Sequence, residues 1–384
     1  MNKLKRIGLL VDASRAYGRG VCRGVANFAD TREDWLLLPH ERPELRELPG
    51  WLERSRLDAL IAYIPNRRLH LKIVSLGIPT VDVHGRCRDS KIPVIESEAE
   101  VLVTLALKFF ARAGFRHFAF CGYPSVFFSD QREAAFRLNA AGSGGSVHIF
   151  SSSTPRPLGQ DLYEFEKGNA ADAKKLMAWL RALPKPIAIL TCNDIRGHQV
   201  INACREKNIS IPEDVAVLGI DNDEIICRLS KPTLSSIEPD VEKVGFLAAS
   251  LIAMRLAGRP VARLHRVPPR QIVERQSTDT VVAEAPEVVL AARLIRSQTR
   301  ISVDQVCEQT KISRSKLDRL FVEHLGRSIA GEITRARLQL SQNFLLNSAM
   351  TMSQIAAQCG FCSATYFCRF FKRETGQTPE AFRR

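Results

Sequence analysis

The sequence predicts a two-lobed α/β unit with parallel sheets, followed by an all-α unit. Three observations support this fold class. Across the first 278 residues, short apolar runs rich in β-branched residues alternate with amphipathic helical patterns, which is typical of parallel sheets with helical crossovers. About nine such alternations exceed the strands of one doubly wound sheet, so two lobes are expected. After residue 285 the strand patterns stop and only short helical patterns remain.

The elements of the α/β part follow from the spacing of its apolar residues. Continuous or alternating apolar runs predict strands at Arg6–Val11, Leu57–Ile64, Pro79–Val83, His117–Cys121, Val147–Phe150, Ile187–Thr191, Val215–Ile220 and Arg270–Arg275. Helical periodicity predicts helices at Gly20–Phe28, Arg68–Leu76, Glu98–Ala113, Gln131–Asn139, Ala170–Leu183, Asp194–Lys207 and Val241–Leu256. The stretch Gln276–Pro286 is polar, then small and acidic, without periodicity. We therefore expect domains at 1–278 and 286–384, with a linker at 279–285.

Composition limits the class of protein. The chain has 384 residues, of which 45% are hydrophobic and 25% are charged, so wholesale disorder is excluded. No apolar run approaches the roughly 20 residues of a membrane span, and the apolar run after the basic N-terminus is too short for a signal peptide. A cytoplasmic location is expected, in which the ten cysteines would be free thiols.

Positive charge is concentrated towards the C-terminus. The formal net charge is +14, and residues 281–384 hold 15 Lys and Arg against 9 Asp and Glu. This segment is about twice as basic per residue as the remainder. A basic C-terminal part indicates a polyanionic partner such as DNA.

Two segments of this C-terminal part repeat one layout. Ser302 precedes a short helix, Thr310–Ile312 form a turn, and a second helix covers Arg314–Leu325. About 49 residues later Thr351 precedes Met352–Gln358, a turn follows, and the next helix covers Ser363–Glu374. Ile333, Ala336, Leu340 and Phe344 predict one helix that connects the two segments. A short helix, a tight turn and a second helix are the helix-turn-helix pattern.

The outward faces of the two second helices suit double-stranded DNA. The predicted DNA-binding residues are Arg314, Ser315, Lys316, Arg319, Ala364, Thr365 and Arg369. Arginine can donate two hydrogen bonds to guanine, and small side chains allow close approach to base edges or phosphates. The alternative is that these residues form the solvated faces of a helical bundle. The repeated layout favours DNA binding.

A family resemblance strengthens this interpretation. The segments Ile355–Phe361, Tyr366–Arg373 and Gly376–Pro379, with Phe382 and Arg383, resemble the AraC-type DNA-binding signature over roughly residues 286–384. The resemblance implies two helix-turn-helix units that bind adjacent major-groove segments. It places Ser315, Arg319, Thr365 and Arg369 at base-contacting positions. Asp318 departs from the polar or basic residues of the family, and it could repel a phosphate or accept from a cytosine amine.

The first 278 residues resemble the periplasmic-binding-protein-like domain of LacI-type repressors. The segments that carry this resemblance are Val215–Asn222, Pro232–Ile237 with Val244 and Gly245, and Arg275–Thr278. A LacI-type domain joined to an AraC-type domain resembles the regulator family of bacterial xylose operons, as do Ala16–Tyr17, Arg19 and Arg132–Glu133. The resemblance implies a sugar effector, D-xylose or a related pentose, and activation of transcription.

The strand ends indicate where a sugar would bind. Ligands of open α/β sheets lie beyond the carboxyl ends of the strands. Polar or aromatic residues at or near these ends form the predicted ligand site: Asp12, Ser14, Tyr17, Phe127, Arg132, Asn193, Asp194, Asp221 and Asn222. Carboxylates, amides and a guanidinium can bind vicinal hydroxyls, and Tyr17 with Phe127 or Phe128 can cover an apolar sugar face. The alternative is that the Asp and Asn residues only cap the helices that follow.

Several functions remain as alternatives, and some partners follow from the mechanism. Sugar binding is expected to favour closed lobes and to change the affinity for DNA through the linker. A homodimer would place two DNA-binding domains on a repeated operator, and an activator would contact RNA polymerase. The same architecture could sense another sugar or a sugar acid, or repress transcription. A sugar-converting enzyme with a DNA-binding tail is a further alternative, although no paired-carboxylate or His-rich constellation supports it.

No cofactor or metal is expected. The glycines from Gly18 to Gly24 are one residue too far apart for the dinucleotide fingerprint, and close helix packing explains them better. Cys359 and Cys362 have the spacing of a redox pair but lie in the second helix-turn-helix turn. No second Cys-x-x-Cys motif completes a zinc site.

Overall fold

The computed structural model describes residues 4–40, 48–87, 92–141, 145–150, 162–166, 170–280, 285–298 and 300–383. The chain divides into two compact units between Thr278 and Asp279. The larger unit contains residues 1–109 and 116–278, and it has the α/β architecture that the sequence predicts. The smaller unit is formed by residues 110–115 and 279–384, and the regular elements of its described residues are helices.

The first lobe of the larger unit has a six-stranded parallel sheet in the order β11-β5-β4-β3-β1-β2. Its strands are β1 (Lys5–Leu10), β2 (Trp35–Pro39), β3 (Ala59–Ala62), β4 (Thr80–Asp82), β5 (Val94–Ser97) and β11 (Leu264–Val267). Its helices are α1 (Ala16–Ala29), α2 (Leu48–Arg54), α3 (Arg67–Ser75) and α10 (Val241–Leu256). Side chains alternate along β1, so Ile7 and Leu9 pack with α1 and α10, whereas Leu10 packs with α2 and α3.

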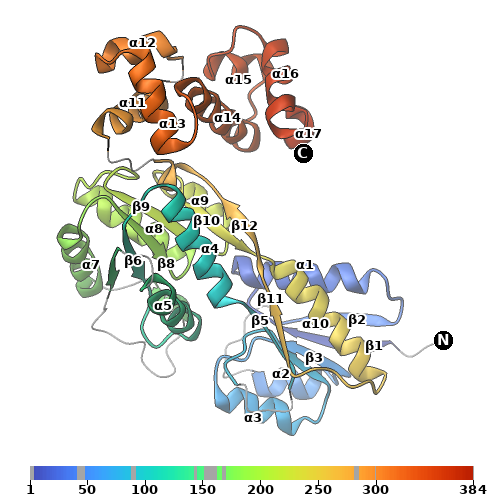
Figure 1. The fold of residues 1–384 in the computed structure, drawn as a ribbon. Helices are drawn as coiled ribbons and strands as arrows, with labels where there is room; N and C mark the ends of the chain where they lie inside the picture. The colour runs from blue at the N-terminus through green and yellow to red at the C-terminus, as the bar shows by residue number, and fades with distance from the viewer. Residues whose placement is uncertain are drawn as a thin grey trace. The chain divides into compact units, whose positions relative to one another are not determined.

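Close helix packing explains the glycines of α1. Figure 1 shows α1 and α10 side by side against the first sheet. A Cβ atom on Gly24 would lie 1.9 Å from the Glu242 carbonyl oxygen, and one on Gly245 would lie 2.1 Å from that of Val21. These two helices therefore touch through their backbones, which only glycine permits.

The second lobe has a sheet in the order β12-β10-β9-β8-β6-β7, in which only β12 is antiparallel to its neighbour. Its strands are β6 (His117–Cys121), β7 (Ser146–Ile149), β8 (Ile187–Thr191), β9 (Val215–Ile220), β10 (Ser235–Pro239) and β12 (Pro269–Val273). Its helices include α5 (Phe127–Ala140), α6 (Leu162–Glu166), α7 (Ala170–Ala182), α8 (Asp194–Glu206) and α9 (Glu224–Leu229), and α4 (Ala99–Arg112) follows β5. Every residue of β8 and β9 is buried, as expected for central parallel strands.

The two lobes are not consecutive in the chain. The chain leaves the first sheet after β5, returns through α10 and β11, and enters the second sheet again at β12. Three connections therefore join the lobes, so each lobe depends on segments that lie far apart in the sequence.

Predicted elements with strong apolar patterns coincide with the structure. The strands β6, β8 and β9 and the helix α10 begin and end at the predicted residues. The prediction missed the short strands β2, β5, β10 and β11 and the helices α2, α6, α9, α11 and α17. Strand β10 (Ser235–Pro239) is largely buried, but its polar residues give no apolar pattern in the sequence. Ser235 and Ser236 can be buried because they form hydrogen bonds within the lobe.

The smaller unit consists of α11 (Pro286–Ser297), α12 (Val303–Thr310), α13 (Arg314–Leu325), α14 (Ile329–Asn347), α15 (Met352–Gln358), α16 (Ala364–Thr375) and α17 (Pro379–Arg383). The pairs α12–α13 and α15–α16 have the predicted helix-turn-helix order, and α14 is the predicted connecting helix. Side chains of Ser302 and Thr351 cap α12 and α15, and each cap is completed by a glutamine three residues later. The two helix-turn-helix units therefore begin with the same capping box.

The segment just before the predicted linker is bonded within the larger unit. Gln276–Thr278 form a 3-10 turn, and the fully buried Ser277 donates to the Val217 carbonyl of β9 at 2.6 Å. Gln276 accepts from the Thr233 N–H at 3.1 Å. Residues 281–284 of the expected linker lie outside the described residues.

Candidate ligand site and candidate DNA-binding surface

The carboxyl ends of strands from both lobes supply the side chains of the candidate ligand site. In the first lobe Asp12 follows β1, Tyr63 follows β3 and His84 follows β4. In the second lobe Asn193 follows β8 and Asp221 follows β9. This edge of each sheet is where α/β proteins bind ligands.

Side chains at these strand ends meet across the two lobes. Arg15 of the first lobe forms an ion pair with Glu166 of the second at 2.5 Å. Arg19 and Asp223 form another ion pair at 3.1 Å. These contacts show that the two strand edges face each other within the larger unit.

Arg132 and Asp221 are the central charged pair of the site. Arg132 is buried on α5, donates from Nη1 to the Cys192 carbonyl, and holds Nη2 3.7 Å from Asp221 Oδ1. Burial raises the pKa of Asp221 to about 6, although the positive charges of Arg132 and Arg15 oppose this shift. The pair is therefore a partly desolvated donor and acceptor, because Arg132 is buried and the Asp221 side chain is 24% exposed, and Asp221 gains a proton as the pH falls through about 6.

The backbone at Asp221 and Asn222 is strained into position. Their φ angles are 114° and 48°, which are uncommon for residues other than glycine. Asp221 donates its N–H to the Ile237 carbonyl, and Asn222 donates its N–H to Ser236 Oγ. Arg275 also donates to Asn222 Oδ1 at 2.8 Å. Such strain persists where surrounding bonds hold it, and it is common in ligand sites.

Aromatic side chains form the other half of the site. Tyr63 stacks on His84 with ring centroids 3.9 Å apart, and His84 meets Phe127 of the second lobe edge-on at 5.1 Å. Tyr17 donates its hydroxyl to the Val83 carbonyl at 2.8 Å. Burial raises the pKa of Tyr17, and Asp82 and Asp221 are among the charges that add to this rise. Tyr17 of the first lobe therefore lies near Asp221 of the second.

Asp12 and Ser14 form a local turn at the end of β1. Asp12 Oδ1 accepts from the Ser14 N–H at 2.9 Å and from the Ser14 hydroxyl at 2.6 Å. Ser14 is exposed, and Asp12 is half-buried. Both side chains therefore already have each other as partners, and a ligand would have to share them.

Asn193 and Asp194 are engaged within the second lobe. Asn193 caps α8 by accepting from the Arg196 N–H, and it donates to Glu166 at 2.7 Å. Asp194 is buried, and its two carboxylate oxygens accept from Ser236 Oγ at 2.6 Å and from the Asp223 N–H at 2.7 Å. Burial raises the pKa of Asp194, and the nearby Asp221 charge adds to this rise. Asn193 therefore acts as a helix cap, as the alternative interpretation has it, whereas Asp194 bonds to the segments on either side of the Asp221 loop.

Sequence reasoning missed four residues that the structure brings to this site. They are Arg15, Tyr63, His84 and Glu166. His84 comes directly after the predicted strand Pro79–Val83, and Tyr63 is the second-last residue of the predicted strand Leu57–Ile64, so the strand-end rule could have found both. Glu166 lies on the short helix α6, and its place beside Arg15 and Asn193 depends on pairing across the lobes.

The second helix of the first helix-turn-helix unit, α13, exposes the predicted residues. Arg314, Ser315, Lys316 and Arg319 are all exposed. Arg314 lies 4.0 Å from Asp304 and 3.8 Å from Asp318, and Lys316 lies 3.5 Å from Glu287. Carboxylates therefore already offset part of the positive charge on this face.

Asp318 has a structural role that the sequence did not reveal. Its Oδ1 accepts a hydrogen bond of 3.0 Å from the Ile329 N–H, at the first turn of α14. A carboxylate at a helix N-terminus satisfies an otherwise unpaired N–H. Asp318 therefore holds α13 to α14, which accounts for its departure from the family pattern.

The second helix of the second unit, α16, presents a less neutralised face. Thr365 and Arg369 are exposed, Ala364 is half-buried, and Lys372 continues the basic face. Among the residues that the structure describes, no carboxylate forms an ion pair with Arg369 or Lys372. Phe367, Phe370 and Phe371 are buried beneath them and anchor the helix.

Within the described parts of the chain, no group of His, Cys, Asp and Glu side chains could hold a metal ion. No described helix is both long and apolar enough to span a bilayer.

Comparisons with known proteins agree with both units. Residues 107–278 match the family model of the periplasmic binding protein-like domain, and residues 306–384 match that of a helix-turn-helix domain. A parallel two-lobed unit with charged strand ends, joined to two helix-turn-helix units, defines a DNA-binding transcription regulator rather than an enzyme.

Full-length relatives narrow this class. The xylose operon regulatory protein of Escherichia coli (strain K12) is 30% identical over 99% of this chain and 97% of its own length. That of Haemophilus influenzae is 28% identical, with 98% of both chains covered. A solved structure of the xylose-binding transcription activator xylR superposes with a TM-score of 0.72 at 28% identity and covers 100% of this chain. The chain belongs to the family of bacterial xylose operon regulatory proteins.

Proposed function

We propose that this protein is a transcription activator that binds D-xylose between the lobes of its larger unit and responds by changing its hold on DNA. The observation that carries the proposal is the partly desolvated Arg132–Asp221 pair, which lies where strand ends of the two lobes face each other. The relatives that span the whole chain are named for xylose regulation.

The site offers the chemistry that a pentose needs. The Asp221 carboxylate can accept from two neighbouring hydroxyls, and the Arg132 guanidinium can donate to a ring or hydroxyl oxygen. The stacked pair of Tyr63 and His84, with Phe127, can cover an apolar face of the sugar. Because the polar groups are partly desolvated, a ligand that lacks a matching hydroxyl would leave them unpaired, and this disfavours it.

Sugar binding can act on the equilibrium between open and closed lobes. Residues of both lobes line the site, so a sugar that contacts both favours the closed form. The interlobe pairs Arg15–Glu166 and Arg19–Asp223 contribute to the same closure. The sugar shifts this equilibrium only by the difference between its affinities for the two forms.

The smaller unit supplies the DNA contacts in this proposal. Arg319 and Arg369 would bind base edges, with Ser315 and Thr365 beside them, while Arg314, Lys316 and Ala364 would lie at or near phosphates. Phosphate contacts make the affinity for DNA fall as salt increases. A homodimer would place two smaller units on a repeated operator, and an activator would then contact RNA polymerase in the cytoplasm.

A thermal-shift screen tests the sugar site. D-xylose is expected to raise the melting temperature of the larger unit more than L-arabinose, D-ribose or D-glucose. The D-xylose affinity of Asp221→Ala should fall roughly tenfold to hundredfold, because hydrogen bonds to a charged group each contribute about 1.5–3 kcal/mol. Glu213→Ala is the matched control, since it removes a carboxylate just before the opposite end of β9.

The outcomes of this screen separate the proposal from its alternatives. A larger shift with another sugar or a sugar acid would keep the architecture and replace the effector. Unchanged D-xylose affinity in Asp221→Ala would overturn the site. Chemical conversion of D-xylose during long incubation would favour an enzyme instead.

A further inference from the structure

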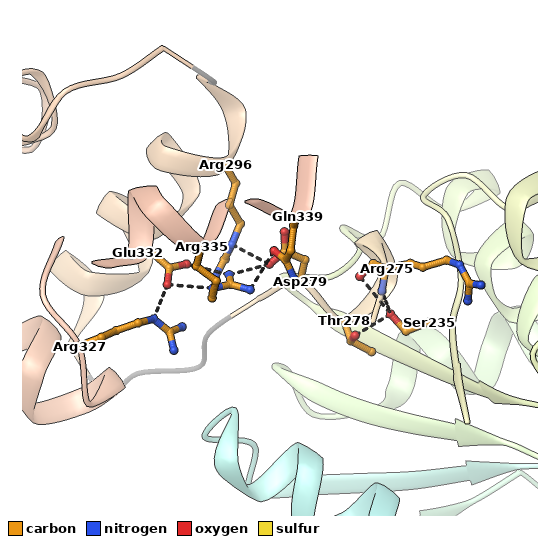
Figure 2. Close-up of polar contacts among 9 residues, drawn as sticks. All are labelled: Ser235, Arg275, Thr278, Asp279, Arg296, Arg327, Glu332, Arg335 and Gln339. Atoms are coloured by element: carbon orange, nitrogen blue, oxygen red, sulfur yellow. Dashed lines mark hydrogen bonds and ion pairs between the residues drawn. The ribbon is translucent and has the colours of Figure 1, made fainter. Parts of the chain in front are cut away.

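The junction between the two units has polar anchors on both sides. Thr278 is the last residue of the larger unit, and Asp279 is the first residue of the smaller unit. Figure 2 shows that each of these neighbouring residues is bonded to its own unit. Side-chain contacts therefore fix the junction at these two residues. The composition of the segment instead suggests a linker without such contacts.

On the side of the larger unit, the anchor leads back to the ligand site. Thr278 shares a hydrogen bond of 2.7 Å with the fully buried Ser235, whose hydroxyl also accepts from the Arg275 N–H at 2.7 Å. The Arg275 guanidinium donates to Asn222 Oδ1 at 2.8 Å and to the Leu234 carbonyl at 2.9 Å. Three consecutive polar contacts thus join the loop of Asp221 and Asn222 to the last residue of this unit.

On the side of the smaller unit, Asp279 enters a buried charge cluster. Its Oδ1 lies 2.8 Å from Arg335 Nη2 and 3.2 Å from Arg296 Nε. Both arginines also bind Glu332, which is fully buried and additionally pairs with Arg327 at 2.5 Å. We call these five residues, Asp279, Arg296, Arg327, Glu332 and Arg335, the Glu332 cluster (Figure 2).

The charges of the cluster explain why Asp279 is held firmly. Three arginines surround Glu332, and their charges and hydrogen bonds lower its pKa to about 2. One carboxylate cannot neutralise three guanidinium groups, so Asp279 supplies the second negative charge. Partly buried ion pairs are strong when their geometry is good and their remaining hydrogen bonds are satisfied. Arg335 meets this condition, because it also donates to Gln339.

We propose that Asp279 is the coupling residue of this regulator: it fastens the junction to the DNA-binding unit, so that movement of the Asn222–Arg275–Thr278 path is passed on. This inference rests on the proposed function. Thr278 and Asp279 share a peptide bond, so no flexible residue lies between the two anchors. A shift of Thr278 therefore moves Asp279 as well. Asp279 is the first residue of the expected linker, and its ion pairs determine which helices receive the shift, namely α11 through Arg296 and α14 through Arg335.

The test measures coupling separately from binding. The full-length protein is used to select a DNA fragment from a random pool, and its affinity for that fragment is then measured with and without D-xylose at constant salt. The ratio of the two affinities is the coupling, which is about 5–150-fold in typical allosteric proteins. In Asp279→Asn the ratio should fall to within about twofold of unity, while sugar affinity, measured by thermal shift, stays at the wild-type value. Glu380→Ala, an exposed carboxylate of the same unit, is the control and should keep the full ratio.

A second variant guards against a loss of folding. Inserting Gly-Ser-Gly between Thr278 and Asp279 adds slack and leaves every side-chain contact of the Glu332 cluster available. This variant should also lose the ratio and should bind DNA as tightly as one of the two wild-type states. Asp279→Glu keeps the charge and should retain much of the ratio.

The outcomes are distinguishable from failure of the proposed function. A wild-type protein whose DNA affinity ignores every sugar contradicts the proposed function itself. A wild-type ratio that persists in Asp279→Asn or in the insertion variant overturns the coupling role of Asp279. If Asp279→Asn no longer binds DNA, the insertion variant alone tests the coupling role of Asp279.

Discussion

The two helix-turn-helix units share a layout but differ in what stabilises them. The first, α12–α13, packs with α11 and α14, where the Glu332 cluster combines one fully buried carboxylate with three arginines. The second, α15–α16, is built on an aromatic core in which Phe361, Phe367 and Phe370 contact one another or their neighbours within 6 Å.

This difference separates two tasks. Removing one partner from a buried charge cluster is strongly destabilising, because the remaining charges lose their partner. Such a cluster is therefore sensitive to a shift of any of its members, which suits it to receive a conformational signal. An aromatic core is less dependent on partners and suits a stable platform for DNA. Asp279 pairs with Arg296 of α11 and Arg335 of α14, the helices that pack with the first unit, and α13 of that unit presents the partly neutralised basic face. We infer that the first unit receives the sugar signal and that the second contributes more of the constant DNA affinity.

Removing the buried carboxylate should give the largest effect. Glu332→Ala leaves three arginines without their common partner, and we expect it to destabilise the first unit by about 3–5 kcal/mol. Hydrogen exchange in α11–α14 should rise strongly, with less change in α16. All three tryptophans lie in the larger unit, so the midpoint of their fluorescence on denaturation should not move. Glu323→Ala on exposed α13 is the control, and an equal effect there would contradict the prediction.

Acid should open the first helix-turn-helix unit before the second, because it removes the charge of Glu332. The folded pKa of Glu332 is about 2, below the value of about 4.3 expected in the unfolded chain. Its contribution is therefore complete above pH 4.3 and is lost as the pH falls towards 2, by roughly 3 kcal/mol in total. Circular dichroism and hydrogen exchange should show α11–α14 opening before α15–α16. Simultaneous opening of both would argue against a special role for the cluster.

Arginines on α13 and α16 should contribute unequally to the affinity for DNA. Arg369→Ala removes a proposed base-contacting arginine that has no carboxylate partner among the described residues, and it should cost about 1–3 kcal/mol of DNA affinity. Arg314→Ala should cost less, because Asp304 and Asp318 already compensate its charge. Fluorescence anisotropy with a selected DNA fragment measures both. A larger loss in Arg314→Ala would reverse the proposed division.

The smallest effect concerns the two turns. Lys311 ends α12 with a φ of 57°, and Gly360 follows α15 with a φ of 76°, so both turns require the left-handed region. Gly360→Ala should destabilise the second unit by about 1 kcal/mol, because a Cβ disfavours this conformation. Lys311→Gly should stabilise the first unit slightly, by less than about 1 kcal/mol. Urea denaturation followed by hydrogen exchange measures both effects, and a stabilising Gly360→Ala or a destabilising Lys311→Gly would contradict the prediction.

Local signals predicted much of the fold. Strands β8 and β9 are continuous apolar runs, and every residue in them is buried, so their limits are readable from the sequence. The helix-turn-helix units were predictable because capping residues, helical periodicity and turn residues all lie within about ten positions of one another. Edge strands such as β2 and β11 were not, because they are short and partly exposed.

The candidate site was predicted less completely than the fold. The predicted site residues Asp221 and Arg132 lie within 3.7 Å of each other in the structure. The strand-end rule did not distinguish Asp221 from Asp194, whose oxygens are occupied by Ser236 and Asp223. It also gave no indication that Asp318 bonds to α14 or that Glu166 faces Arg15.

Sequence alone determined the order of the two units, the parallel α/β architecture and the duplicated DNA-binding layout, because each depends on patterns within a few turns of chain. Tertiary structure decided which charged side chains remain available and which are already paired. Asp279 and Arg335 are 56 positions apart, and Arg15 and Glu166 belong to different lobes. Such pairs depend on distances in space, and the free energy of a buried charge depends on what surrounds it. No periodicity in the sequence carries that information.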